Sequence, residues 1–378
     1  MNQNKTIQVL KPLIREQSIN AVSEVLRSGW LGLGPKTEEF ENNIIKYLGS
    51  SNFASYLNSA TSALHLALHI LDLQDGDEVI TTGLTFCSTN NVILQQRAKL
   101  VPVFTDIDRT TGCLDPEDIE RKITSRTTVI IVVLYAGYSA DMVKINTLAE
   151  KHNIKVIEDA AHAMGGSYEN GLKIGNSNNI VCLSFQAVKN LPVGDGGMIL
   201  VPTKEMLERC NKLRWLGIDK STHSRTSKVG EYLWKYEVDE LGYKFHGFDI
   251  TAAIGVEQLK FLDGDNARRE HISNLYRQEL NGVPGILPFV DRSKGKSSCH
   301  FEPILVDRRD DLIQHLKAHG IHPGVHYRNN ANYSAYSQYK TDLPNTDWFE
   351  NHEITLPIHM HLSNEDLDYI INTVKKGW

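Results

Sequence analysis

Cysteine is scarce in this sequence, and its few copies are scattered. The 378 residues contain five cysteines, an odd number, and no two of them form a CxxC pair. They are Cys87, Cys113, Cys182, Cys210 and Cys299. This pattern argues against a disulfide framework and against a cysteine-rich zinc site. A chain of this length can bury a large core without such cross-links.

Long apolar runs and an excess of one charge are missing as well. The longest apolar run, residues 129–136, is too short to cross a bilayer, and the polar start MNQNKTIQ lacks the apolar stretch of a secretory signal. Forty Lys and Arg against 46 Asp and Glu give a net charge of −6 with histidine neutral, which does not favour a nucleic-acid surface. We therefore expect a cytoplasmic protein that binds neither nucleic acid nor membrane.

What the chain does contain is an alternation of short apolar runs with amphipathic stretches. The apolar runs lie at residues 78–80, 100–104, 129–134, 156–157, 180–185 and 198–201. Helical patterns lie between them, at residues 89–97, 116–123 and 142–152. A further helix is expected over residues 59–73, where Ser59 or Thr61 can cap its start. The alternation predicts an α/β fold, with a mostly parallel sheet sandwiched by helices.

The first part of the chain predicts a helix outside this alternation. Ile19, Val22 and Leu26 recur at helical spacing ahead of Gly29, a residue type that commonly ends helices. Residues 30–36 (WLGLGPK) then predict a loop. No internal repeat or low-complexity tract follows, so a solenoid is not supported.

The pattern changes again after about residue 203. A polar stretch at 219–231 has no clear period, and a long helical pattern covers residues 250–280. Smaller elements follow at residues 304–306, 310–319 and 364–375. We expect a large domain at residues 1–260 and a smaller C-terminal α+β domain at residues 261–378.

Four short segments carry side chains that suit one kind of chemistry. An apolar strand ends at Asp159, in VIEDAAH, and Lys189 follows another, in SFQAVKN. Burial of such a lysine favours the neutral amine that Schiff-base chemistry needs. Small residues open a helix at NSATSA, whose free N–H groups can cradle a phosphate. Phe86 places an aromatic ring just after a strand end.

Taken singly, each of these segments has an ordinary structural interpretation. Asp159 could cap a loop, Lys189 could be a solvated surface residue, and Phe86 could pack in the core. Together the segments fit pyridoxal phosphate, which needs a lysine for a Schiff base, an acid for the ring nitrogen, a phosphate cup and a stacking surface. In parallel sheets such ligands bind at the carboxyl ends of the strands.

The motifs around these residues resemble a known family. SGWLGLGPKTEEFE, NSATSALHLAL, GLTFCSTNNVI, VIEDAAHAMGG, SFQAVKN, GDGG and GYKFHGFDITAAIGVEQL are closely similar to the DegT/DnrJ-type sugar aminotransferases. That family is a branch of the fold-type I, aspartate-aminotransferase-like enzymes of pyridoxal phosphate. The resemblance extends from about Pro12 to the closing TLPIHMHLSNEDLDYII.

The resemblance implies a role for each matching residue. Lys189 would form the Schiff base as the catalytic residue, Asp159 would hold the pyridine nitrogen, and His162 would contact the ring hydroxyl. Further cofactor contacts are implied for Ala60, Thr61, Phe86 and Ser184. Lys244 matches a position that contacts the phosphate of the neighbouring subunit, which implies a homodimer with composite sites. Segments that approach the substrate in the family contain Trp30, His326, Tyr327 and Arg328.

The chain departs from the family pattern in two places. Many relatives read GEGG where this chain has GDGG at residues 194–197, and many read GYNYR where it has Lys244 and His246. A cation at position 244 still complements a phosphate. The change from arginine to histidine leaves no role to carry over to His246.

The resemblance also implies a reaction. Family members with histidine in place of Lys189 are dehydratases, so lysine favours transamination. The implied reaction moves an amino group from L-glutamate to a nucleotide-linked 3- or 4-keto-6-deoxy sugar, for lipopolysaccharide or another deoxyaminosugar product. Two alternatives stay open: a lyase or dehydratase chemistry of the same cofactor, and an idle regulatory relative, which would be expected to have lost Lys189 or Asp159.

Other cofactors are less well supported. No GxGxxG follows an apolar strand, which disfavours a nicotinamide enzyme. His359 and His361 would point to one face of a strand, with His322 and His326 near them in sequence. No cysteine or carboxylate is spaced to complete such a group, so we expect no metal site.

Overall fold

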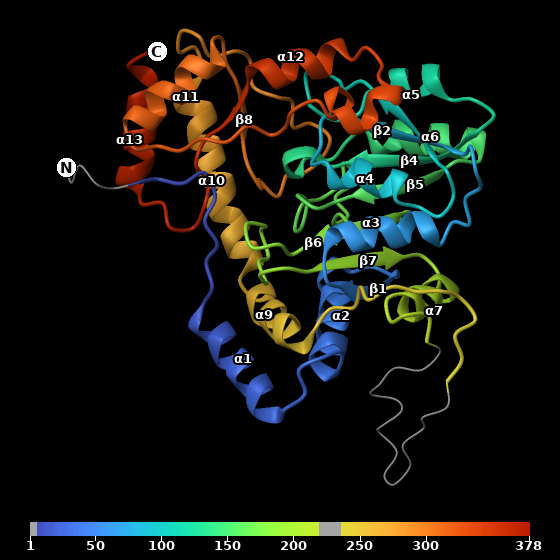
Figure 1. The fold of residues 1–378 in the computed structure, drawn as a ribbon. Coiled ribbons are helices and arrows are strands. Elements are labelled where there is room, and N and C mark those ends of the chain that lie inside the picture. Colours follow the sequence, from blue (N-terminus) through green and yellow to red (C-terminus); the bar gives the residue numbers. More distant parts are fainter. Residues whose placement is uncertain (1–5, 219–235) are drawn as a thin grey trace.

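A computed structural model describes residues 6–218 and 236–378 of the chain. At its centre lies a seven-stranded sheet with the order β1-β7-β6-β5-β4-β2-β3 (Figure 1). The strands are β1 (Phe53–Leu57), β2 (Glu78–Thr82), β3 (Val101–Thr105), β4 (Thr127–Val133), β5 (Lys155–Asp159), β6 (Ile180–Ser184) and β7 (Gly197–Val201). Strands β2 to β6 are parallel, and β7 pairs antiparallel with both β6 and β1. The α/β fold with a mostly parallel sheet is thus confirmed.

Helices cover both faces of this sheet. Because side chains alternate along a strand, Ile130 and Val132 of β4 enter one core while Val129 and Ile131 enter the other. The first core is covered by α2 (Pro35–Leu48), α5 (Pro116–Lys122), α6 (Met142–His152) and α9 (Asp249–Leu259). The second is covered by α3 (Ala60–His69), α4 (Ser88–Leu94) and α7 (Lys204–Leu213).

The N-terminal helices confirm one prediction and correct another. Helix α1 (Glu16–Ser28) ends at Gly29 as expected, but Ile19 and Leu26 are 50% and 53% exposed, and the buried positions are Ser18 and Val25. The expected loop at 30–36 is also too long, because α2 already begins at Pro35.

The early start of α2 has a distant cause. The Asp249 carboxylate accepts hydrogen bonds from the backbone N–H groups of Gly34, Lys36 and Thr37, at 3.0, 3.1 and 2.9 Å. The Thr37 hydroxyl donates to the same carboxylate at 2.7 Å. These contacts satisfy N–H groups that a helix start leaves without a partner. A cap supplied from more than 200 residues away leaves no local signal in the sequence.

The long helical pattern at 250–280 is two helices rather than one. Helix α9 ends at Leu259, and α10 (Leu262–Leu280) leads to a C-terminal group of elements (Figure 1). This group contains α11 (Arg309–Ala318), α13 (Asn364–Lys375) and the antiparallel pair β8 (Pro303–Leu305) and β9 (Glu353–Thr355). Residues 7–9 also hydrogen-bond to this group, through Ile7 and Val9. The division of the chain near residue 260 stays a prediction.

The C-terminal part returns to the large sheet through a loop that follows Tyr327. Its short helices η2 (Asn330–Asn332) and η3 (Ser334–Tyr339) bring Ala331 and Tyr336 against Phe104 of β3. This packing holds residues 326–333 beside the carboxyl end of the sheet.

A buried carboxylate fixes the end of that loop. Asp106, just after β3, accepts from the backbone N–H groups of Asn345 and Thr346 at 2.9 and 2.8 Å, and from the Thr346 hydroxyl at 2.7 Å. These contacts cap α12 (Pro344–His352). We expect Asp106→Ala to cost about 1–2 kcal/mol, as loss of a helix cap does, and to lower the melting temperature by a few degrees. Asp368→Ala, at an exposed position of α13, is the matched control and should leave the melting temperature unchanged.

The polar stretch at 219–231 and the first five residues lie outside the described residues. Within the described ranges, we find no helix with the length and apolar character needed to cross a membrane.

Candidate active site

A cavity of about 390 Å³ opens at the carboxyl ends of the parallel strands. Asp159 ends β5, Ser184 ends β6, and Phe86 follows β2. The cavity brings together nine of the predicted site residues: Ala60, Thr61, Phe86, Asp159, His162, Ser184, Lys189, His326 and Tyr327. A larger hollow of about 830 Å³, between α2 and α7, contains no predicted site residue.

Asp159 is a buried carboxylate with neutral hydrogen-bond donors. The Thr89 hydroxyl of α4 donates to its Oδ2 at 2.7 Å, and the backbone N–H of Ala161 donates to its Oδ1 at 3.2 Å. Burial raises the pKa of Asp159, and these two contacts and the charge of Lys189 oppose the rise. The carboxylate thus faces the cavity without a cation in direct contact among the described residues, and a bound cationic group would stabilise its charge.

The N-terminus of α3 forms another wall. The Ser59 hydroxyl accepts from the Ser62 backbone N–H at 3.1 Å and caps the helix, as predicted. Strand β7 begins directly beneath it, because Gly197 has no side chain. A Cβ on Gly197 would lie 2.3 Å from the Ala60 nitrogen and 2.2 Å from the Ser59 carbonyl carbon. Gly197, the last glycine of the GDGG motif, is therefore needed for this close approach, and Ser59, Ala60 and Thr61 at the start of α3 line the cavity.

Lys189 lies in the turn after β6 and reaches the same cavity. Burial lowers the pKa of Lys189 to about 8, and the charge of Asp159 opposes that shift. At neutral pH the amine is protonated in most molecules, yet a useful fraction is neutral. Its Nζ lies 3.5 Å from Nε2 of His300, a residue that the sequence did not single out.

Aromatic rings stack along one side of the cavity. The His162 ring stacks on His300, with centroids 4.8 Å apart, and on Tyr327, with centroids 6.0 Å apart. The Tyr327 hydroxyl lies 3.1 Å from Nε2 of His162. Burial holds the pKa of His162 well below its usual value and lowers that of His326 to about 3. Both imidazoles are therefore neutral at physiological pH.

Three predicted site residues do not line the cavity of this single chain. Lys244 lies over the Trp215 ring, with Nζ 3.3 Å from the centroid, and burial lowers its pKa. The indole N–H of Trp30 donates to the Leu33 carbonyl at 3.1 Å. Arg328 lies over the Tyr333 ring at 5.1 Å. Their roles at the site stay predictions.

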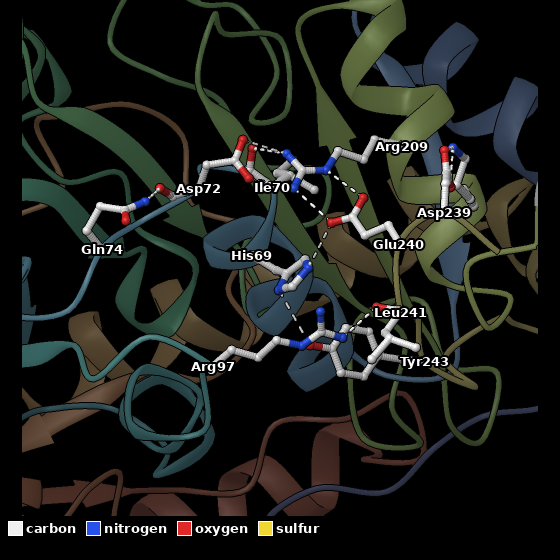
Figure 2. A network of polar contacts seen from close by, with 11 residues as sticks. His69, Ile70, Asp72, Gln74, Arg97, Arg209, Asp239, Glu240, Leu241 and Tyr243 are labelled. Carbon is white, nitrogen blue, oxygen red and sulfur yellow. Dashed lines mark hydrogen bonds and ion pairs between the residues drawn. The ribbon is translucent and has the colours of Figure 1, made fainter.

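A polar network anchors the segment that leads to Lys244 (Figure 2). Arg209 binds Asp72 through two hydrogen bonds of 2.6 and 2.8 Å and contacts Glu240 at 2.9 and 3.1 Å. Glu240 also lies 3.2 Å from Nε2 of His69. Because that carboxylate accepts from Nε2–H, Nδ1 of His69 can accept from the Tyr243 hydroxyl, 3.4 Å away. Five side chains thus fix the backbone just ahead of the lysine.

The histidines near the C-terminus do not lie on a strand, contrary to the expectation. Strand β9 ends at Thr355, and His359 and His361 lie in the turn that follows. Their Nε2 atoms lie 3.1 and 3.0 Å from the carbonyl oxygens of Gln8 and Pro12. Among residues 6–218 and 236–378, no group of three or more His, Cys, Asp or Glu side chains is placed to hold a metal ion.

The comparisons with known proteins agree with one another. Residues 12–375 match the DegT/DnrJ/EryC1/StrS aminotransferase family model. The chain is 37% identical over 376 residues to the spore coat polysaccharide biosynthesis protein SpsC of Bacillus subtilis, across 96% of this chain and 95% of that protein. It is 35% identical over 394 residues to the UDP-4-amino-4-deoxy-L-arabinose–oxoglutarate aminotransferase of Shewanella sediminis, across 99% and 98%.

Solved structures share the whole fold. The PLP form of Spr1654 from Streptococcus pneumoniae matches with a TM-score of 0.89 and 31% identity, over 98% of each chain. The PMP form of the same protein matches with a TM-score of 0.90 and 32% identity, over 98% of this chain and 97% of that one.

Proposed function

This chain belongs to the DegT/DnrJ/EryC1/StrS aminotransferase family, and from that premise we propose that it transfers the amino group of L-glutamate to a nucleotide-linked keto sugar. It is a sugar aminotransferase that depends on pyridoxal phosphate. The acceptor that we propose is a 3- or 4-keto-6-deoxy sugar, and its product would enter a surface polysaccharide or another deoxyaminosugar compound. The Shewanella relative is named as an oxoglutarate aminotransferase. Because 2-oxoglutarate is what L-glutamate becomes when it gives up its amino group, this name supports glutamate as the donor.

The cavity fits pyridoxal phosphate at each of its chemical groups. The first turn of α3, with Ala60 and Thr61, would hold the phosphate together with Ser184, since backbone N–H groups and the helix dipole favour an anion there. The buried Asp159 would hold the protonated ring nitrogen, whose charge compensates the cost of burying the carboxylate. Phe86 and His162 lie on the cavity wall where they would contact the ring. When bound, the cofactor withdraws electrons from the amino-bearing carbon.

Lys189 is the residue that carries the proposal. It lies in the same cavity as Asp159 and the start of α3, and its lowered pKa supplies a neutral amine near neutral pH. Such an amine can take a proton from the amino-bearing carbon of the donor, and the resulting ammonium would give that proton to the cofactor carbon that receives the nitrogen. With the keto acceptor the lysine would make the same two moves in reverse. A lysine in this place thus supports transfer rather than dehydration.

An assay with isolated substrates tests this proposal. The purified enzyme, loaded with pyridoxal phosphate, is incubated with L-glutamate and a panel of nucleotide-linked 3-keto and 4-keto 6-deoxy sugars. We expect one sugar to yield an amino sugar and 2-oxoglutarate in equal amounts, as measured by mass spectrometry. A dehydrated sugar, or no 2-oxoglutarate with any panel member, would overturn the proposal.

We further propose that the active enzyme is a homodimer in which Lys244 reaches the phosphate in the partner's cavity. The side chain points onto Trp215 and lies outside its own cavity, so a second copy can use it. Mixing inactive Lys189→Ala and Lys244→Ala proteins should then restore activity, because each mixed dimer holds one intact site. Random exchange predicts recovery of about a quarter of the wild-type activity. Mixed dimers that form but stay inactive would refute the composite site.

A further inference from the structure

We infer that His300 is the positioning residue for Lys189: its unprotonated Nε2 accepts an N–H of the lysine and holds the amine toward the cavity. This inference rests on the proposed role of Lys189. It goes further by assigning a task to a residue 111 positions away in sequence. The two atoms are 3.5 Å apart, and contacts of this kind are commonly long before the substrate binds.

The protonation state of His300 follows from a chain of hydrogen bonds that starts at the backbone. The Asn266 side-chain N–H, on α10, donates to the Met164 carbonyl at 3.0 Å, so the Asn266 oxygen is an acceptor. Asn190 donates to that oxygen at 2.7 Å and to the Ser298 carbonyl at 2.8 Å. Both hydrogens of the Asn190 amide are thereby used, and its oxygen is left to accept.

That oxygen determines which nitrogen of His300 carries the proton. The Asn190 Oδ1 lies 3.0 Å from Nδ1 of His300, and an oxygen that can only accept requires Nδ1 to donate. In the neutral ring, Nε2 then has a free lone pair, and this is the atom that faces Lys189. The proton on the imidazole is thus set by two backbone carbonyls, from Met164 and Ser298.

The surroundings keep the ring neutral and in place. The titratable or charged groups that act on His300 are Lys189, His162, Arg269 and His326. Burial and the charge of Lys189 hold the pKa of His300 well below its usual value. The His300 backbone is held by the Ala136 carbonyl at 3.2 Å and by Arg269, which donates to the His300 carbonyl at 3.2 Å.

The groups around Lys189 orient its amine. Asp159 is the opposite charge near Lys189, and His162, His326 and His300 offer neutral rings around it. Among the described residues, His300 is the side chain with a hydrogen-bond contact to Nζ. An acceptor at that position stabilises the ammonium form more than the amine, so it also keeps the pKa of Lys189 from falling further.

Two substitutions of His300 test the roles of its two ring nitrogens separately. His300→Asn keeps an amide near the Nδ1 position, where it can still donate to Asn190, but it is too short to reach Lys189. His300→Gln places an amide near the Nε2 position, where its oxygen can accept from Lys189. Thermal melting of both variants checks that they fold.

The readout is the rate at which the apoprotein captures pyridoxal phosphate on Lys189 as a function of pH. For the wild type we expect a midpoint near pH 8, since only the neutral amine reacts. In His300→Asn the midpoint should fall by about half a unit to one unit, and in His300→Gln it should stay near the wild-type value. Superimposed profiles for folded His300→Asn and wild type would overturn the inference, as would an equal shift in both variants. Absence of capture by the wild type would instead refute the proposed function.

Discussion

Replacing Lys189 by alanine is expected to remove both the covalent link to the cofactor and the transfer reaction. The side chain lines a cavity rather than filling a core, so the variant should fold. It should still bind pyridoxal phosphate through α3 and Asp159, but without an absorption band near ~410–430 nm, the region expected for a lysine-bound cofactor. Loss of the acid–base group should lower the rate of transfer by about 10³-fold or more.

Lys189→Arg is the matched control for charge. Arginine keeps a cation in the cavity but is not deprotonated at any usable pH, so it should be as inactive as alanine. Wild-type absorption in Lys189→Ala, or turnover close to the wild-type rate, would mean that another lysine binds the cofactor.

Asp159→Asn should have the second-largest effect, with the fold retained. The amide is nearly the same size as the carboxylate, but it has one acceptor where Thr89 and Ala161 both donate. It also carries no charge to keep the cofactor's ring nitrogen protonated. Breaking a buried charge pair costs about 3–5 kcal/mol, which corresponds to a fall in kcat of about 10²–10³-fold or more.

Thr89→Val tests the hydrogen bond to Asp159 separately from the charge of Asp159. This variant removes the 2.7 Å contact to Asp159 and leaves the carboxylate in place. Loss of one hydrogen bond to a charged group should reduce kcat by about tenfold. If Asp159→Asn turned over at a rate close to that of the wild type, a different residue would have to hold the ring nitrogen.

The strands of the sheet could be predicted because their signals are local. The six apolar runs between residues 78 and 201 are strands β2 to β7. Strand β1 could not be found in this way, since its sequence FASYL has no β-branched residue and no clear alternation. It forms because β7 offers an antiparallel partner, with Phe53 opposite Val201.

The helix patterns leave open what distant residues decide. The stripe of Ile19, Val22 and Leu26 predicts a helix correctly, but α1 packs through Ser18 and Val25 instead. The spacing alone does not say which side meets α9. The start of α2 likewise depends on Asp249, which is remote in sequence.

In the candidate site, too, some residues have a local sequence signal and others are brought in only by the fold. Asp159 and Lys189 could be predicted to lie together because one ends an apolar strand and the other follows one, and parallel strands bring their carboxyl ends to one edge. His300 could not be found in the sequence, since only the fold brings it from before β8 to Lys189. Its partner Asn190 adjoins the lysine in SFQAVKN, yet one amide after a lysine carries no distinctive signal.

Three predicted site residues do not reach the cavity within a single chain: Lys244, Trp30 and Arg328. The motifs assign them to the site, but in one copy they contact Trp215, Leu33 and Tyr333. A site shared between copies would account for this, and the mixing experiment addresses it.

The central claim is that Lys189 and its cavity perform amino transfer from glutamate. An absorbance spectrum of the purified protein with pyridoxal phosphate, recorded before and after excess L-glutamate, tests it most directly. The account predicts a band near ~410–430 nm that glutamate converts to one near ~330 nm, with release of 2-oxoglutarate. A band that glutamate leaves unchanged, or no band at all, would contradict it.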